Sequence, residues 1–197
     1  MRHATQIALA ALTLSAGIAP EPASADRSQL RRVTQGVTIK NRLGKKVFTD
    51  LGFVDHNGKH VRLRHFFDGK RPVILTLNYY ACKTLCNVQL RQFTDGLKGL
   101  EWVPGETFRV VTVSINPRET PADARTMRKN FLDHFGKKHV DWTFMVGREQ
   151  DIKRLANSVG FHYRWDPMYE QYIDVTAIFF VSPTCSLTRF IHGLKYP

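Results

Sequence analysis

Two long apolar runs constrain the fold of this 197-residue chain more than any other feature. PVILTLNYY (residues 72–80) and FRVVTVSI (residues 108–115) are rich in β-branched residues and lack regular polar alternation. Runs of this kind predict strands that are buried on both faces of a sheet. Between them, apolar side chains recur every three or four residues, which predicts a helix with one buried face, at positions 86, 90, 93, 97 and 100.

The remaining elements continue this alternation. Asn57-Gly58 is a strong turn signal, so residues 48–63 are predicted to form a hairpin. The other expected elements are a helix from Pro121 with Thr120 as its N-cap, a strand at 142–147, a helix at 149–159 ended by Gly160, and strands at 173–183 and 187–193 around a turn at Pro183. We therefore predict an α/β domain with a central mixed sheet flanked by helices and an N-terminal β-hairpin.

Residues 1–25 have the pattern of a secretory signal peptide. Arg2 precedes an apolar run at residues 7–19, and Ala23-Ser24-Ala25 matches a small-residue cleavage site. The run is shorter than the roughly 20 residues that a membrane span needs, which argues against an uncleaved anchor. We expect cleavage after Ala25 and a protein that works outside the cytoplasm, which in a bacterium is the periplasm.

The chain is strongly basic, with 29 Lys and Arg against 17 Asp and Glu and a formal net charge of +12. The excess is concentrated near the start of the mature chain. Residues 26–45 are polar and basic with little periodicity, so we expect a flexible segment there and the folded domain at residues 46–197. Export argues against a nucleic-acid partner. An anionic membrane surface or an acidic partner protein fits the charge better, and a solvated basic face explains it equally well.

The stretch NYYACKTLCNVQL (residues 78–90) places Cys82 and Cys86 where the first buried strand leads into the helix. Amide groups at a helix start favour thiolate, and positions i and i+4 share one helix face. Such a pair can form a reversible disulfide, bind a soft ion such as Cu(I), or act as a structural cross-link, which would stabilise little because the loop is short. Cys185 is left as an odd thiol.

Four motifs in order resemble the SCO/SenC family, whose members are thioredoxin-fold proteins that help to assemble the copper centre of respiratory oxidases. The resemblance covers residues 45–197 and includes the strand end into C-x-x-x-C. The other three motifs are VSINPRETP (113–121), LANSVGFHYRWDP (155–167) and AIFFVSP (177–183), the last followed by LTRFIHG.

The resemblance implies a copper site made of two cysteine thiolates and one histidine, nine residues before the proline of the last hairpin turn. Counting back from Pro183 gives Asp174, so the implied ligands are Cys82, Cys86 and, in place of histidine, Asp174. A carboxylate is a harder ligand than imidazole, so Cu(I) is expected to bind better than Cu(II). Of the eight histidines in the chain, only His162 is a candidate neighbour of the cysteines.

The chain departs from the family pattern at three further points. Asn116 replaces an aspartate and Cys185 stands where the family's turn has glycine. We further expect residues 46–197 to lack the family's final helix.

The expected function is that of an exported metallochaperone rather than an enzyme. It would bind copper, or reduce thiols, in assembly of a respiratory-oxidase copper centre, with a copper-receiving oxidase subunit or a periplasmic redox protein as its partner. Membrane association is a further expectation. The alternatives are a periplasmic thiol–disulfide oxidoreductase without stable copper binding and a degenerate member with a partner-binding role.

Overall fold

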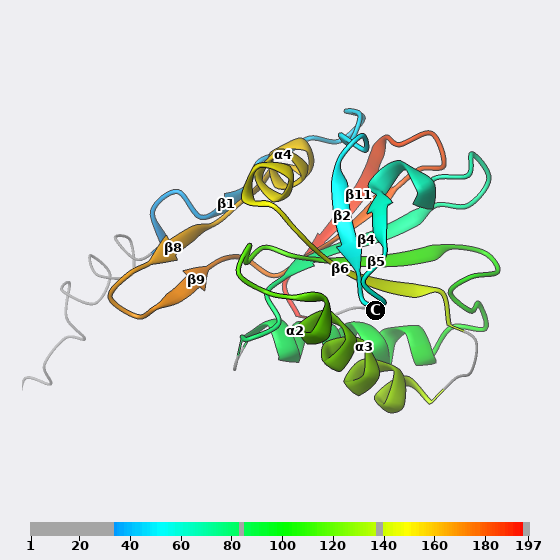
Figure 1. Ribbon diagram of the computed structural model, residues 1–197. Helices are drawn as coiled ribbons and strands as arrows, with labels where there is room; N and C mark the ends of the chain where they lie inside the picture. The colour runs from blue at the N-terminus through cyan, green and yellow to red at the C-terminus, as the bar shows by residue number, and fades with distance from the viewer. Residues whose placement is uncertain (1–33, 83–84, 137–139, 195–197) are drawn as a thin grey trace, which may run out of the picture. The chain divides into compact units, whose positions relative to one another are not determined.

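The computed structural model describes residues 34–82, 85–136 and 140–194 (Figure 1). The expected signal peptide at residues 1–25, the start of the basic segment at residues 26–45 and the last three residues of the chain lie outside this part. Within the described ranges, no helix combines the length and the apolar content that a membrane crossing requires.

A seven-stranded mixed sheet organises the domain, in the order β11-β10-β4-β5-β6-β2-β3 (Figure 1). β4, β5 and β6 are parallel to one another, and β10 pairs with β4 in the antiparallel direction. The predicted hairpin is β2 and β3, which joins the far edge of the same sheet through β6. The strands are β2 (Gly52–Asp55), β3 (His60–Arg62), β4 (Val73–Asn78), β5 (Arg109–Ser114), β6 (Trp142–Gly147), β10 (Ala177–Val181) and β11 (Leu187–His192).

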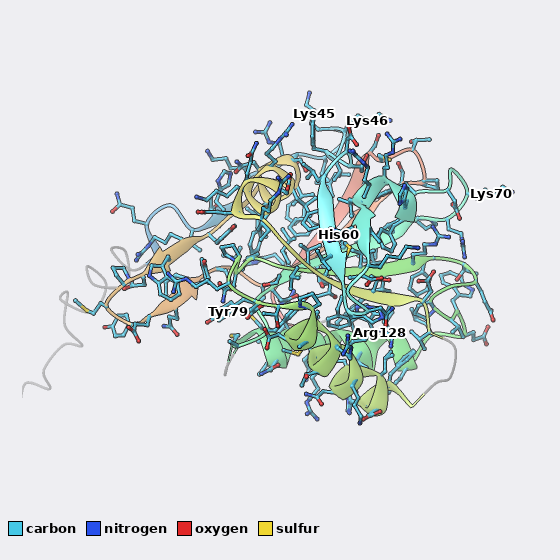
Figure 2. All side chains as sticks on the ribbon, viewed as in Figure 1. Lys45, Lys46, His60, Lys70, Tyr79 and Arg128 are labelled. Carbon is cyan, nitrogen blue, oxygen red and sulfur yellow. The ribbon has the colours of Figure 1, made fainter. Side chains whose placement is uncertain are left out.

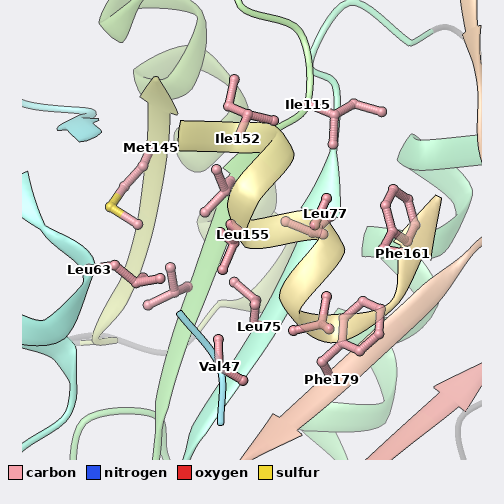
Figure 3. Packing of buried hydrophobic residues seen from close by; sticks show 14 of the residues in the cluster. Val47, Leu63, Leu75, Leu77, Ile115, Met145, Ile152, Leu155, Phe161 and Phe179 are labelled. Atoms are coloured by element: carbon pink, nitrogen blue, oxygen red, sulfur yellow. The ribbon is translucent and has the colours of Figure 1, made fainter. Parts of the chain in front are cut away.

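The helices cover both faces of this sheet, as Figure 1 shows. α2 (Leu85–Lys98) and α3 (Pro121–Phe135) pack on one face through an apolar cluster that contains Leu90, Phe131 and Trp142. α4 (Glu149–Val159) packs on the other face, where Figure 3 shows Ile152 and Leu155 in the same cluster as Leu75 and Leu77. Alternate residues of β4 therefore contribute to two separate cores, as a strand buried on both faces must.

The helix ends follow local sequence signals. Thr120 and Asp123 form a capping box, in which each side chain bonds the other residue's backbone N–H, and Pro121 occupies the first helical position of α3. Gly136 and Gly160 end α3 and α4 in the left-handed conformation, with φ of +73° and +78°. These boundaries confirm the predicted helices.

One strand prediction is wrong at its start. Residues 173–183 were expected to form a single strand, but β10 begins at Ala177 and Ile173 ends β9 (Gln171–Ile173), which pairs with β8 (Arg164–Asp166). The cause is that the Tyr172 ring packs with the rings of Tyr163 and Trp165, so residues 171–173 pair with β8 instead of β4. Asp174 consequently lies in the link between two sheets.

Part of the expected flexible segment is hydrogen-bonded to the domain. β1 (Thr38–Ile39) pairs with β7 (Phe161–His162), and Lys40 N–H donates to Gly160 O at 2.8 Å. Val47 N–H donates to Cys185 O at 2.8 Å. Residues 38–47 therefore run along the folded domain, up to the boundary where the domain was expected to begin.

Gly160→Ala and Gly136→Ala separate steric contact from backbone strain. Both glycines have positive φ, but a Cβ at Gly160 would lie 1.9 Å from Lys40 O, whereas a Cβ at Gly136 meets nothing within 4 Å. We expect Gly136→Ala to lower the free energy of unfolding by about 1 kcal/mol and Gly160→Ala by at least about 2 kcal/mol more. Urea unfolding measures both, and equal losses would contradict the close packing of residue 40 on α4.

Candidate functional site

The two cysteines lie just beyond the end of β4. A turn in which Cys82 N–H donates to Tyr79 O at 3.3 Å leads from the strand to α2. Cys82 and Cys86 are 4% and 3% exposed, and both are present as thiols. Cys86 N–H donates to Cys82 Sγ at 3.4 Å, so a backbone donor of the first helical turn serves the Cys82 sulfur. The pair is shielded from water on most sides and already adjacent.

Asp174 joins this pair from far along the chain. Cys86 Sγ lies 3.8 Å from Asp174 Oδ2, although the residues are 88 positions apart. The register of the sheet explains the contact: Ile178 of β10 pairs with Thr76 of β4 in the antiparallel direction, so residues before β10 lie beside those after β4. The structure thus brings Asp174 to Cys86, which itself adjoins Cys82.

Burial shifts the protonation of the site towards its neutral forms. Burial, and then the Cys82 sulfur, raise the pKa of Asp174 to about 7. The hydrogen bond with Cys82, followed by burial and by the Asp174 charge, raises the pKa of Cys86. The sequence predicts thiolate character from the helix start; at Cys86 the hydrogen bond with Cys82, burial and the Asp174 charge act in the opposite direction, because each raises the pKa of the thiol.

The Glu119 carboxylate fixes the chain just before the cysteines. Its Oε2 accepts from Tyr80 N–H at 2.9 Å, and its Oε1 accepts from Ala81 N–H at 2.8 Å. Ser114 Oγ, at the end of β5, donates to the same carboxylate at 2.5 Å. Burial raises the pKa of Glu119, and these three donors oppose that rise. The sequence contains Glu119 within its family-like VSINPRETP motif, but sequence reasoning assigned it no role.

A pair of buried hydrogen bonds, one between side-chain amides and one to the backbone, holds α2 against the sheet. Asn78 Nδ2 donates to Gln89 Oε1 at 2.8 Å, and Gln89 Nε2 donates to Ala177 O at 2.7 Å. Asn78 and Gln89 are each 1% exposed. One helix side chain therefore bridges β4, which precedes the cysteines, and β10, which follows Asp174. The available signal was the Asn78 amide inside the apolar run at residues 72–80, and sequence reasoning did not use it.

Aromatic rings cover the side of the site that faces the β8–β9 hairpin. The Tyr79 and Tyr172 rings meet edge to face at 5.5 Å, and Tyr172 also contacts Trp165 at 5.0 Å. Arg118 lies over the Trp165 ring at 5.3 Å. Tyr80, in contrast, points into the other core, where its hydroxyl donates to Met145 O at 2.7 Å.

The dithiol site offers two sulfur ligands for a metal ion, and a third protein ligand is less evident. Across the described ranges, no group of three or more His, Cys, Asp and Glu side chains is gathered as a metal site. His162 lies in β7, where burial and the charges of Lys40 and Arg42 lower its pKa, so the structure places it with these cations. The soft donors are the adjacent sulfurs of Cys82 and Cys86, a pair that suits a thiophilic ion of low coordination number.

The fold and the paired thiols together define the class of the protein. It is a thioredoxin-like α/β domain with a dithiol where a central strand leads into a helix. The family model described as SCO1/SenC matches residues 40–195. The chain belongs to the SCO1/SenC family, which confirms the resemblance and the fold class predicted from the sequence. No curated protein sequence matches it.

Solved structures of similar fold include members of the same family. A proposed electron transfer protein from Aquifex aeolicus VF5 has a TM-score of 0.68 at 22% identity, over 79% of this chain and 87% of that chain. ScoI from Arabidopsis thaliana with copper bound has a TM-score of 0.58 at 18% identity, over 77% and 88%. BsSco, a cytochrome c oxidase assembly protein of the Sco family with a disulfide switch, has a TM-score of 0.57 at 22% identity, over 79% and 88%.

Glu119→Gln tests whether this carboxylate fixes the dithiol turn. An amide offers one acceptor where the carboxylate offers two, so one backbone N–H loses a charge-assisted bond. We expect the free energy of unfolding to fall by about 1.5–3 kcal/mol and the Tyr80 and Ala81 amides to exchange hydrogen faster. Glu149→Gln, which removes an exposed pair with Lys153, is the control and should cost under about 1 kcal/mol. Unchanged amide exchange in Glu119→Gln would contradict the assignment.

Asp174→Asn should remove a pH dependence of stability. The pKa of Asp174 is raised to about 7 from an ordinary 3.8, so the folded state binds this proton more tightly than the unfolded chain. The stabilisation is complete below about pH 4 and is lost as pH rises to about 7, by roughly a few kcal/mol. Urea unfolding of the reduced protein from pH 4 to 8 should show this loss in the wild type and a flatter profile in Asp174→Asn. Parallel profiles would contradict the burial of an ionisable carboxyl.

Proposed function

We propose that this protein is an exported copper carrier that serves the assembly of a respiratory-oxidase copper centre. Copper is its cargo, held as Cu(I) by the sulfurs of Cys82 and Cys86 with Asp174 beside them. The observation that carries the proposal is the contact between Asp174 and an adjacent, buried thiol pair. Membership of the SCO1/SenC family and the copper-bound ScoI structure of similar fold support it.

The residues suggest how the site is loaded and emptied. Two thiols must lose their protons before their sulfurs bind a metal ion. Asp174 Oδ2 lies 3.8 Å from Cys86 Sγ and its pKa is about 7, so its ionised form can take the Cys86 proton as copper enters. Low exposure of both sulfurs protects the bound ion from water. A partner that presents its own soft ligands can then remove copper from a two-sulfur site by ligand exchange.

The proposal includes the expected processing of the chain. Residues 1–25 act as the signal peptide, residues 26–45 follow as a basic segment, and residues 46–197 form the copper-carrying domain. Outside the cytoplasm, dithiols are oxidised unless a reductant or a metal holds them, so copper loading and oxidation compete for Cys82 and Cys86. The mass of the protein recovered from the periplasm tests cleavage after Ala25.

A thiol–disulfide oxidoreductase is the second candidate function, favoured by the hydrogen-bonded thiols. In this reaction one cysteine attacks a target disulfide as thiolate and the other resolves the mixed disulfide. The target gains two electrons and two protons as two thiols, and Cys82 and Cys86 lose them as they form a disulfide. The disulfide switch of BsSco supports this alternative. A Cys82–Cys86 midpoint potential too low for physiological thiols to reach would exclude it.

Copper titration separates the two functions. We expect reduced wild-type protein to retain one Cu(I) against a competing chelator and Cys82→Ala/Cys86→Ala to retain none, because both soft ligands are gone. Cys185→Ala, which changes the remaining cysteine, is the matched control and should behave as wild type. Asp174→His should raise Cu(II) affinity at least about tenfold, since imidazole suits Cu(II) well. Equal copper retention by the wild type and the Cys82→Ala/Cys86→Ala variant would contradict the proposal that the protein carries copper.

A further inference from the structure

Four cationic side chains gather on one surface away from the dithiol. Arg42, Lys45 and Lys46 come from the turn that follows β1, and Arg154 comes from α4. Together with Phe48 they line a shallow hollow of about 560 Å³. We call this surface the basic turn patch. Figure 2 shows Lys45 and Lys46 at the top of the domain and Tyr79, which precedes the dithiol, far below them.

The charges of the basic turn patch are uncompensated. No carboxylate lines the hollow, and within the described residues none of its four cations forms an ion pair. Lys46 Nζ donates to the backbone oxygen of Thr184 at 2.5 Å, and Arg154 stacks over the Phe48 ring at 4.1 Å. Cations elsewhere, such as Arg71 and Lys129, pair with aspartates. The patch therefore presents a concentrated positive field to an anionic partner.

Exposed apolar side chains lie among these cations. Leu43 is 45% exposed and Phe48 is 42% exposed. Leu43 sits at the tip of a tight turn in which Lys45 N–H donates to Arg42 O at 3.0 Å, and Gly44 supplies the positive φ of +76°. An apolar tip flanked by Lys and Arg is the pattern of a segment that lies in a membrane interface, where cations meet lipid phosphates and apolar groups enter the acyl boundary.

The turn is held in place before any partner binds. Gly44 N–H donates to Leu187 O at 2.8 Å, and Leu187 N–H donates to Lys45 O at 2.9 Å, which ties the turn to the start of β11. Val47, next along the chain, is 4% exposed and anchors the segment in the core. A preordered turn loses little conformational entropy on binding, so its charges and its apolar tip act together.

We propose that the basic turn patch docks the protein on an anionic phospholipid surface. Arg42, Lys45, Lys46 and Arg154 contact lipid phosphates, and Leu43 enters the interface. This orientation keeps the dithiol end, marked by Tyr79 in Figure 2, away from the membrane contact. The proposal concerns a different surface from the copper or redox site and stands or fails independently of it.

Vesicle binding of the chain left by the proposed cleavage, residues 26–197, tests the proposal. The vesicles are phosphatidylcholine alone or mixed with phosphatidylglycerol, and hydrogen exchange reports which residues are covered. We expect protection of residues 40–48 with phosphatidylglycerol only. Arg42→Gln/Lys45→Gln/Lys46→Gln should weaken this binding about 100-fold, on a basis of roughly fivefold per basic residue near an anionic surface.

A charge-matched variant provides the control. Lys59→Gln/Lys98→Gln/Lys129→Gln removes the same three charges at exposed positions outside the patch and should weaken binding by less than about fivefold. Leu43→Ser should remove the binding that persists at high salt, and Leu100→Ser, at a 38% exposed leucine of another surface, should not.

Three results would overturn the proposal. The first is equal weakening by the two triple variants, which would mean that only net charge matters. The second is vesicle binding without protection of residues 40–48, which would place the contact elsewhere in the chain. The third is protection of these residues by an acidic polypeptide such as polyglutamate but not by phosphatidylglycerol vesicles, which would assign the surface to a protein partner.

Discussion

The antiparallel pairing of β10 with β4 is the constraint on which the site depends. Ile178 pairs with Thr76, so the chain that enters β10 passes the chain that leaves β4. This register alone brings Asp174 to Cys86 across 88 positions of sequence. A slip of one residue would turn each side chain of β10 to the opposite face, and Phe179 and Ile178 would exchange their two cores. The cores therefore protect the geometry of the site.

Polar contacts complete what the sheet register begins. The Gln89 side chain hydrogen-bonds both the Asn78 side chain and the carbonyl of Ala177. These bonds fix α2 against the end of β4 and the start of β10. Glu119 holds the turn between β4 and α2 from the end of β5. A buried amide or carboxylate that loses one partner is destabilising, so these contacts tolerate few alternative arrangements. The ends of β4 and β5 and the start of β10 thereby position the two sulfurs.

Local signals made most of the fold predictable from the sequence. The apolar runs predicted β4 and β5, Asn57-Gly58 predicted the β2–β3 hairpin, and Thr120 with Pro121 predicted the start of α3. The β8–β9 hairpin was not predicted, because its pairing depends on ring contacts of Tyr172 that no local pattern encodes. Glu119 was overlooked for a similar reason: its partners are backbone amides 38 and 39 positions away.

Cys185 shows how a departure from a family pattern acquires a physical meaning. The resemblance to the family implies a glycine at this position, and here the Cys185 backbone has φ of +64°, a conformation that glycine adopts without strain. Asp174 stands where the resemblance to the family implies a histidine, so the proposed difference there lies in the chemistry of the side chain. An imidazole would offer a neutral nitrogen to a metal ion, whereas a buried carboxyl with a pKa of about 7 exchanges its proton at neutral pH. Under the proposed function, this substitution shifts the third group of the site from holding copper towards accepting the proton that copper displaces from Cys86.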